Sequence, residues 1–132
     1  MHKLSGLLFK EDGFCGNQHN YYDYRNSLLD HVLHSRTGIP ISLSVLFAAI
    51  CRRVGVHLDM IGLPGHFLLA TRTEPRIFVD AFHGGATYGL QQVRTQTLTL
   101  ARTGCAADVL SSSLKECKWR VREVGVAGCG KR

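Results

Sequence analysis

Residues 36–56, RTGIPISLSVLFAAICRRVGV, decide the fold that the sequence predicts. Gly38 is a natural stop for a preceding helix, and Pro40 suits the first turn of the next helix, where its missing N–H is not needed. The segment that follows, residues 40–54, is apolar on nearly every side, and two arginines in its last turn complement the helix dipole. We expect a helix of this composition to be buried at the centre of the domain.

A shorter helix is predicted just upstream, over residues 27–36. Asn26 can cap it, because the side-chain oxygen of an asparagine accepts hydrogen bonds from exposed N–H groups in the first turn. Residues 11–24, EDGFCGNQHNYYDY, contain many turn formers and are predicted to be a polar loop. The apolar residues of the short helix fall on one face at helical spacing: Leu28, Leu29, Val32 and Leu33.

After Gly55 the apolar runs become shorter and are separated by LPG and TEP, which is typical of strands joined by tight turns. The runs are HLDMIGL (57–63), HFLLATR (66–72) and RIFVDAF (76–82). Residues 88–104 fit either a helix or a strand. Helices followed by a small antiparallel sheet predict an α+β fold. We expect a main domain over residues 1–90 and a divergent basic segment over residues 91–132, for which poor order is one expectation.

The composition is typical of one soluble globular domain. Of the 132 residues, 45% are hydrophobic and 20% are charged, which suits a chain with one modest core. The sequence has no run of the roughly 18 apolar residues that a membrane helix needs. The apolar patch near the N-terminus is too short for a signal peptide. We therefore expect an intracellular protein, in the cytoplasm or the nucleus.

The cysteines and the charge argue against two further classes of function. Five cysteines without a CxxC pair do not fit a disulfide framework or a zinc site, and no metal or other cofactor is expected. The net charge is +6, of which residues 101–132 supply +4, from 7 Lys/Arg and 3 Asp/Glu. These basic residues are scattered, and Trp119 is the one aromatic among them, so nucleic acid is not an expected partner.

His66 and Asp80 are the residues best placed to carry chemistry. His66 begins one predicted strand and Asp80 ends the next, 14 residues later, so a hairpin would place them side by side. A carboxylate bonded to an imidazole fixes its tautomer and stabilises its charged form, as in Cys-His-Asp and Ser-His-Asp sites. On its own, such a pair on neighbouring strands is more often structural than catalytic.

A nucleophile is missing where the chemistry would need one. A reactive cysteine typically lies at a helix N-terminus, where the dipole lowers the pKa of the thiol. Cys51 lies about eleven residues beyond that point, or about 16 Å at 1.5 Å per residue, and is interpreted as a core thiol. Ser42 is nearer the helix start, but a hydroxyl needs a base within hydrogen-bond reach to act as a nucleophile.

Two further groups of residues are candidates for binding. Residues 21–27, YYDYRNS, combine Tyr22, Arg25 and Asn26 in one short stretch. They could form a recognition surface, although a packed aromatic turn explains the stretch equally well. His83, beside two glycines, is expected near the end of the sheet that carries the His–Asp pair.

Residues 8–85 resemble a known family. The segments RTGIPISLSVL, LPGHFLLA and FVDAFHGG, in this order and spacing, are similar to the transglutaminase-like domain of the bacterial SirB-type proteins. The same domain occurs in eukaryotic F-box-only proteins of the twenty-one type. The resemblance implies a transglutaminase-like, or papain-like, α+β fold in which a central helix packs on an antiparallel sheet. The likeness fades after Gly85.

The resemblance also implies roles for individual residues. The wider superfamily carries a cysteine at the start of the central helix, then a histidine and an aspartate on successive strands. His66 and Asp80 match the histidine and the aspartate, while the cysteine position falls on Pro40 or within one residue of it. Proline has neither a thiol nor a hydroxyl. The resemblance therefore implies a vestigial dyad in a non-catalytic descendant of a cysteine hydrolase or transferase.

Two functions follow from these expectations. The first is a non-catalytic interaction module that holds a protein or peptide in the groove between the helix and the sheet, near Pro40, His66 and Asp80. In an F-box setting this module would recognise substrates for a ubiquitin ligase. The second is an amide or ester hydrolase or transferase that combines His66 and Asp80 with a non-cysteine nucleophile, such as Ser42 or an activated water. A fragment without independent function is a third hypothesis.

Overall fold

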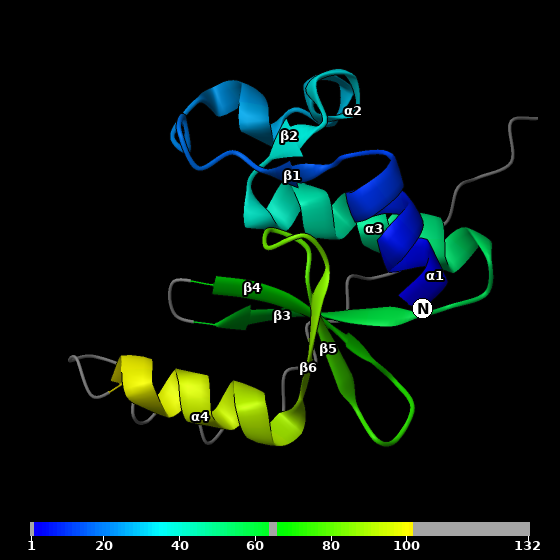
Figure 1. The fold of residues 1–132 in the computed structure, drawn as a ribbon, viewed down its shortest axis with the longest axis vertical. Coiled ribbons are helices and arrows are strands. Elements are labelled where there is room, and N and C mark those ends of the chain that lie inside the picture. The colour runs from blue at the N-terminus through cyan, green and yellow to red at the C-terminus, as the bar shows by residue number, and fades with distance from the viewer. Residues whose placement is uncertain (1, 64–65, 102–132) are drawn as a thin grey trace, which may run out of the picture.

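The computed structural model describes residues 2–63 and 66–101, and within residues 96–101 it describes the backbone alone. The elements, in chain order, are α1 (His2–Ser5), a π-helical turn (Gly6–Glu11), β1 (Cys15–Gly16), a 3-10 turn (Tyr24–Ser27), α2 (Leu29–Ser35), β2 (Thr37–Gly38), α3 (Pro40–Arg53), β3 (Leu58–Leu63), β4 (His66–Thr71), β5 (Ile77–Asp80), β6 (Ala86–Gly89) and α4 (Leu90–Ala101). Figure 1 shows these residues as helices around a four-stranded sheet, with a separate, short parallel pair of strands, β1 and β2, near α3.

The central helix α3 is confirmed with Pro40 as its first residue. The hydroxyl of Ser42 accepts a hydrogen bond from the N–H of Ile39 at 3.1 Å, which satisfies a backbone donor that the start of a helix leaves free. The opposite side of the helix is not covered, since Ile41 is 48% exposed, so the expected burial on nearly every side is wrong. The buried stripe recurs every four residues, as Leu43, Phe47 and Cys51.

Strands β3 to β6 form one antiparallel sheet in chain order. β3 and β4 pair from Leu58, opposite Thr71, to Leu63, opposite His66. The three strands predicted from the sequence are confirmed. The segment that fitted either a helix or a strand contains both, because its first residues belong to β6 and the residues that follow belong to α4.

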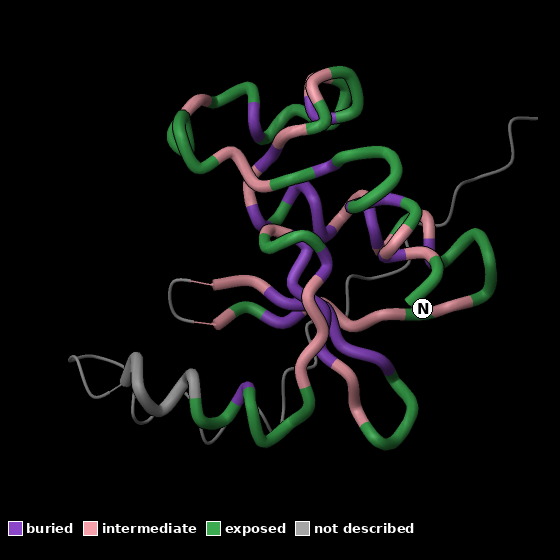
Figure 2. Tube along the Cα trace, viewed as in Figure 1, coloured by how far each residue is buried: buried purple, intermediate pink, exposed green. Residues whose placement is uncertain are grey.

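The two faces of the sheet bury different side chains. Because side chains alternate along a strand, Leu69 and Val79 pack with the buried stripe of α3, whereas Leu68 and Phe78 belong to a second cluster with Val93 of α4. Figure 1 shows α3 above the strands and α4 below them. In Figure 2 the buried segments meet where the strands cross beneath α3. The fold is therefore α+β, with helices on both faces of the sheet.

The prediction for the upstream helix is wrong in two respects. α2 follows Leu28, which makes no side-chain cap hydrogen bond, and Asn26 lies in the preceding 3-10 turn, where it is buried. Val32 is fully buried, but the rest of the expected apolar face is 46%, 43% and 54% exposed at Leu28, Leu29 and Leu33. The helical period located the apolar positions, but α2 is a single short helix whose contact with α3 covers one side of it.

The boundary predicted at residue 90 falls at the start of α4. Residues 91–101 of the predicted basic segment are therefore helical, and the expectation for residues 102–132 lies outside the described residues. Among the helices of the described ranges, none has the length and hydropathy to cross a membrane.

Candidate functional site at the end of the sheet

The His–Asp pair lies where β4 begins and β5 ends. Leu69 is opposite Val79 in the ladder between these strands, and this register places His66 diagonally across from Asp80. The Nε2 atom of His66 is 2.7 Å from Oδ2 of Asp80. The side-by-side placement predicted from the sequence is confirmed.

Asp80 is the centre of a wider polar cluster, and it is 2% exposed. Its Oδ1 atom accepts hydrogen bonds from the backbone N–H groups of Phe82 and His83, both at 3.1 Å. Its Oδ2 atom faces His66 and, at 2.8 Å, Nδ1 of His83. The expected position of His83 near this end of the sheet is confirmed. Two histidines therefore share one carboxylate oxygen.

The hydrogen bonds of the cluster stabilise the ionised carboxylate of Asp80 and the protonated imidazole of His66. Burial raises the pKa of Asp80, but the hydrogen bonds from His66 and His83 outweigh burial and hold this pKa below 3.8. The hydrogen bond with Asp80 raises the pKa of His66 above 6.5 against the opposing effect of burial. Asp80 is thus an ionised acceptor at neutral pH, and the ring nitrogen of each histidine that faces it carries a proton.

The loop of residues 81–85, which carries His83, is fixed at its end. Gly85 has a φ of +71°, a conformation that favours glycine, and its N–H donates to the carbonyl of Asp80 at 2.8 Å. The hydroxyl of Ser5 in α1 donates to the carbonyl of Gly85 at 3.1 Å, and this contact is buried. The N-terminal segment therefore holds the loop that presents His83.

The dyad lies on the α4 side of the sheet. His66 is opposite Leu63, and Leu63 packs with the cluster on that side. Asp80 lies two residues after Phe78 and therefore on the same face of β5, and Phe78 is opposite Tyr88 in the same cluster. Burial raises the pKa of Tyr88, and the charge of Asp80 raises it further. The dyad is thus at the end of the sheet and on the face opposite the core beneath α3.

The start of α3 carries the two residues considered for the nucleophile position, Pro40 and Ser42. Pro40 is buried. The hydroxyl of Ser42 is 4% exposed and donates to the carbonyl of Asn26 at 2.7 Å. In the part of the chain that the structure describes, no hydrogen bond or ion pair joins Ser42 to His66. The polar atoms of Ser42 are therefore engaged in holding the backbone around the helix start.

The other candidate nucleophiles on α3 are in the core. Cys51 is fully buried, and burial raises the pKa of its thiol, in agreement with the interpretation as a core thiol. Ser44 is also fully buried, and within the described ranges its hydroxyl has no hydrogen-bond partner. Sequence reasoning missed this orphan hydroxyl, since nothing in the local pattern distinguishes it from the serine two residues earlier.

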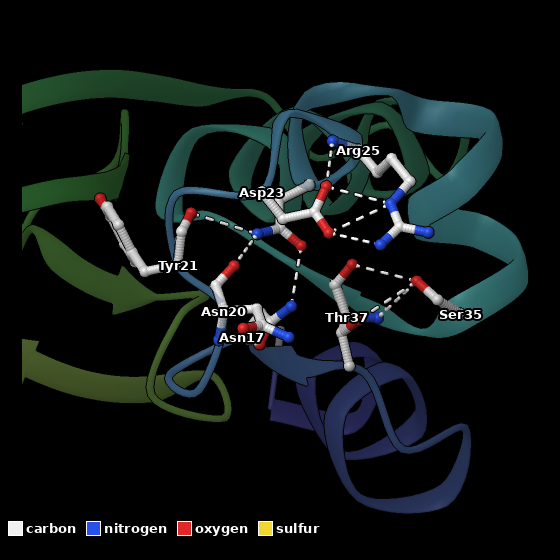
Figure 3. A network of polar contacts seen from close by, with 8 residues as sticks. Asn17, Asn20, Tyr21, Asp23, Arg25, Ser35 and Thr37 are labelled. Atoms are coloured by element: carbon white, nitrogen blue, oxygen red, sulfur yellow. Dashed lines mark hydrogen bonds and ion pairs between the residues drawn. The ribbon is translucent and has the colours of Figure 1, made fainter.

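Residues 19–24 form a loop that is here called the tyrosine loop. Figure 3 shows the polar network that holds this loop. The buried side chain of Asn26 donates to the carbonyls of Asn20 and Tyr21 at 2.7 and 3.1 Å and accepts from Asn17 at 3.0 Å. Asn26 is thus a support of the loop and has no exposed surface for a partner.

The tip of the tyrosine loop is open to solvent. Tyr22 and Tyr24 are 95% and 76% exposed, and the loop lines an open depression of about 530 Å³. The guanidinium of Arg25 is held by Asp23, with N···O distances between 2.6 and 3.1 Å. The base of this stretch is therefore a packed turn and its tip exposes two aromatic side chains, while its role as a recognition surface stays a prediction.

Aromatic contacts connect the tyrosine loop with the polar cluster. The ring of Tyr21 meets the ring of Phe82 edge-on at a centroid distance of 5.9 Å, and Phe82 meets His83 at 5.3 Å. His83 in turn is 5.6 Å from His66. The tyrosine loop is therefore in contact with the polar cluster through Tyr21, which sequence reasoning did not predict.

Comparison with known proteins identifies the class to which this fold and this arrangement of residues belong. A family model described as the transglutaminase-like superfamily matches residues 1–120. The match covers most of the chain, so the chain belongs to the transglutaminase-like superfamily. No solved structure gives a significant match.

The similar proteins fall into two groups, the UPF0162 proteins and F-box only protein 21. A UPF0162 protein of Xylella fastidiosa (strain Temecula1 / ATCC 700964) is 40% identical over 95 residues, which is 71% of this chain and 34% of that protein. The UPF0162 protein of Vibrio cholerae is 38% identical over 80 residues, 59% of this chain and 30% of the relative. F-box only protein 21 of Homo sapiens is 44% identical over 66 residues, 50% of this chain and 10% of the relative. The chain thus spans about a third or less of the length of these relatives.

Proposed function

We propose that this chain is a non-catalytic transglutaminase-like module that binds a protein or peptide partner. The observation that carries the proposal is the state of the helix start. Pro40 offers no nucleophilic atom, and the hydroxyl of Ser42 donates a buried hydrogen bond to the carbonyl of Asn26. A histidine and an aspartate without a nucleophile beside them cannot begin covalent catalysis.

The proposed binding surface is the tyrosine loop together with the adjoining face of the polar cluster. Tyr22 and Tyr24 present large aromatic surfaces to solvent. Tyrosines supply much contact area at a low cost in conformational entropy, which is why they are enriched at protein interfaces. The hydrogen bonds of Asn26 already hold the loop, so a partner would not have to order its backbone.

Similarity to F-box only protein 21 supports a more specific setting. We propose that the module, within a longer protein of that kind, recognises substrates for a ubiquitin ligase, and that it does so inside the cell. The similarity to bacterial UPF0162 proteins names no partner, so the more general role of protein or peptide binding rests on the exposed tyrosine loop. The tyrosine loop would be the recognition surface in both settings.

The first test is activity-based labelling with amide- and ester-directed probes, applied to the wild type and to His66→Ala. Circular dichroism of both proteins verifies that they are folded. We expect no labelling that depends on His66. Labelling that disappears in a folded His66→Ala variant would contradict the proposal, and the labelled residue would identify the nucleophile.

The second test measures the binding surface directly. Partners captured by the wild type are quantified by mass spectrometry and compared with those captured by Tyr22→Ala. We expect the specific partner to be lost with Tyr22, since an exposed aromatic at the centre of an interface often carries more than about 1 kcal/mol of binding energy. Leu33→Ala is the matched control, because Leu33 is a 54% exposed apolar residue on α2. Equal loss in both variants would contradict the assigned surface.

An amide or ester hydrolase or transferase is the second candidate, and the intact dyad favours it. The 2.7 Å contact with Asp80 orients His66 and raises its pKa, as a general base requires. The nucleophile would be a water or the hydroxyl of Ser42. Under this candidate, the labelling and any hydrolysis would be lost in His66→Ala and, if Ser42 is the nucleophile, also in Ser42→Ala, with the fold intact in both.

A further inference from the structure

Asp80 contacts two histidines. A carboxylate that orients a histidine in a His–Asp dyad needs only one, so the second histidine calls for another explanation. The donor atoms of His66, Asp80 and His83 all lie within 4.8 Å of one another. The two contacts to Oδ2 measure 2.7 and 2.8 Å. The cluster thus brings two imidazole nitrogens and one carboxylate oxygen to one point.

We infer that His66 Nε2, Asp80 Oδ2 and His83 Nδ1 form a binding site for a divalent transition-metal ion, with Zn²⁺ as the ion that fits best. Two ligand atoms bound to a tetrahedral Zn²⁺ at about 2.0–2.1 Å lie about 3.3 Å apart. The separations of 2.7 and 2.8 Å therefore need to open by about half an ångström to admit the ion. Two nitrogens and one oxygen form a donor set that Zn²⁺ and related ions accept.

Hydrogen bonds around the cluster already orient the groups that would bind the ion. The other carboxylate oxygen of Asp80 is held by the backbone N–H groups of Phe82 and His83, which is the kind of outer contact that orients a metal ligand. Gly85 is held by Ser5, so the loop that carries His83 is already positioned.

The exposure of the two histidines allows an ion to enter. The side chain of His83 is 53% exposed and that of His66 is 25% exposed, whereas the carboxylate is 2% exposed. An ion could thus approach from the solvent side over the imidazoles. Because three protein ligands leave coordination positions open, water would complete the coordination of the ion.

Ion binding requires a rearrangement of protons. Without the ion, the ring nitrogens that face Asp80 carry protons, because an ionised carboxylate can only accept hydrogen bonds. With the ion bound, these nitrogens donate lone pairs to the metal, and each neutral imidazole carries its proton on its other ring nitrogen. Asp80 remains ionised in both states and changes its partner from two N–H groups to the metal.

This inference does not rest on the proposed function, because an ion could be held by a binding module or by an enzyme. The test is isothermal titration calorimetry of the full chain with ZnCl₂ after removal of bound metal, in a Cys15→Ser background that removes one exposed thiol. We expect this Cys15→Ser parent to bind Zn²⁺, and the His83→Ala variant of it to lose the site or bind Zn²⁺ at least roughly tenfold more weakly. His83 is the residue of choice because its exposure makes the substitution compatible with folding.

His57→Ala is the matched control, since His57 is an exposed histidine outside the cluster. It is expected to keep the affinity and stoichiometry of the parent. A second variant, Asp80→Asn, keeps the shape of the side chain and is expected to weaken binding as well. Absence of Zn²⁺ binding in the parent, or equal binding in the parent and His83→Ala, would overturn the inference. Either result would leave the labelling and capture tests of the proposed function unaffected.

Discussion

The start of α3 and the end of the sheet use their polar atoms in opposite ways. At the start of α3, the hydroxyl of Ser42 contacts backbone groups of Ile39 and Asn26, so it serves the local chain path. At the end of the sheet, Asp80 binds His66 and His83 through side chains from two separate segments. The first region is built as a structural cap, and the second as a charged cluster that a ligand could use.

This difference shows that the two regions are held by separate sets of contacts. The polar cluster is held by contacts with strand β4 and with the loop after β5, and within the described residues none of its hydrogen bonds involves α3. A substitution at the helix start can therefore leave the cluster intact. The two regions can be perturbed separately, and the predictions below proceed from the largest expected effect to the smallest.

Removal of the carboxylate should break the sheet end. Asp80→Ala leaves His66 and His83 without their partner, and two backbone N–H groups lose their acceptor. A hydrogen bond to a charged group contributes about 1.5–3 kcal/mol, and because both histidines are partly exposed we expect a total loss of about 3 kcal/mol, which urea unfolding would measure. The control is Asp59→Ala, because Asp59 pairs with exposed Arg72 at 2.8 Å and such surface pairs contribute about 0–1 kcal/mol. Equal losses in the two variants would show that the cluster is not held as described.

Gly16→Ala should disturb the link between the two regions. Gly16 lies in β1, beside β2 and the start of α3, and a Cβ atom there would collide with the ring of Phe82 in the loop after β5. Overpacking of this kind costs about 1–3 kcal/mol. Gly62→Ala in β3 meets nothing within 4 Å and should change the free energy of unfolding by less than about 0.5 kcal/mol. Thermal or urea unfolding of both variants makes the comparison.

The helix start should respond differently to two serine substitutions. Ser42→Ala removes the contacts with Asn26 and Ile39 and should destabilise the protein by about 1–2 kcal/mol. Ser44→Ala removes a buried hydroxyl that has no partner in the described residues, so it should be neutral or stabilising by up to about 1 kcal/mol. Urea unfolding of both variants in parallel measures the contrast. A larger loss for Ser44→Ala would mean that its hydroxyl has a partner and that the assignment is wrong.

The smallest effect is the pH dependence of the pair, measured in metal-free buffer. The pKa of His66 is raised, so its contribution is complete below pH 6.5 and is lost as the pH rises through the folded-state pKa. The pKa of Asp80 is lowered, so its contribution is complete above pH 3.8 and is lost as the pH falls through the folded-state pKa. The stability advantage of the wild type over His66→Gln should be larger at about pH 5.5 than at about pH 9. A pH-independent difference would contradict the charged pair.

Sequence reasoning succeeded where local signals were sufficient. Pro40 and the apolar run after it predicted α3, and the short runs between turn formers predicted the first three strands of the sheet. The spacing between His66 and Asp80 predicted their contact, because a tight hairpin leaves few alternatives for residues at matching strand ends. These features depend on neighbours that lie close in the sequence.

Sequence reasoning failed where burial depends on distant layers. Asn26 resembled a helix cap, but it is buried and bonded to the tyrosine loop. Leu29 and Leu33 resembled core residues, but no layer of the described structure buries them. Propensity identifies which residues favour an element, whereas the side of the element that is covered depends on the packing of the whole chain.

The sequence by itself determined the α+β class, the central helix, the three strands and the neighbouring His66 and Asp80, because periodicity, turn formers and strand spacing are local properties of the chain. The tertiary structure alone decided that His83 contacts Asp80 together with His66 and that the tyrosine loop adjoins the polar cluster. It also decided that the hydroxyl of Ser42 has hydrogen-bond partners, whereas that of Ser44 has none among the described residues. Those outcomes depend on contacts such as that between Ser5 and Gly85, which are 80 residues apart. Contacts at such separations form only when all the layers pack together.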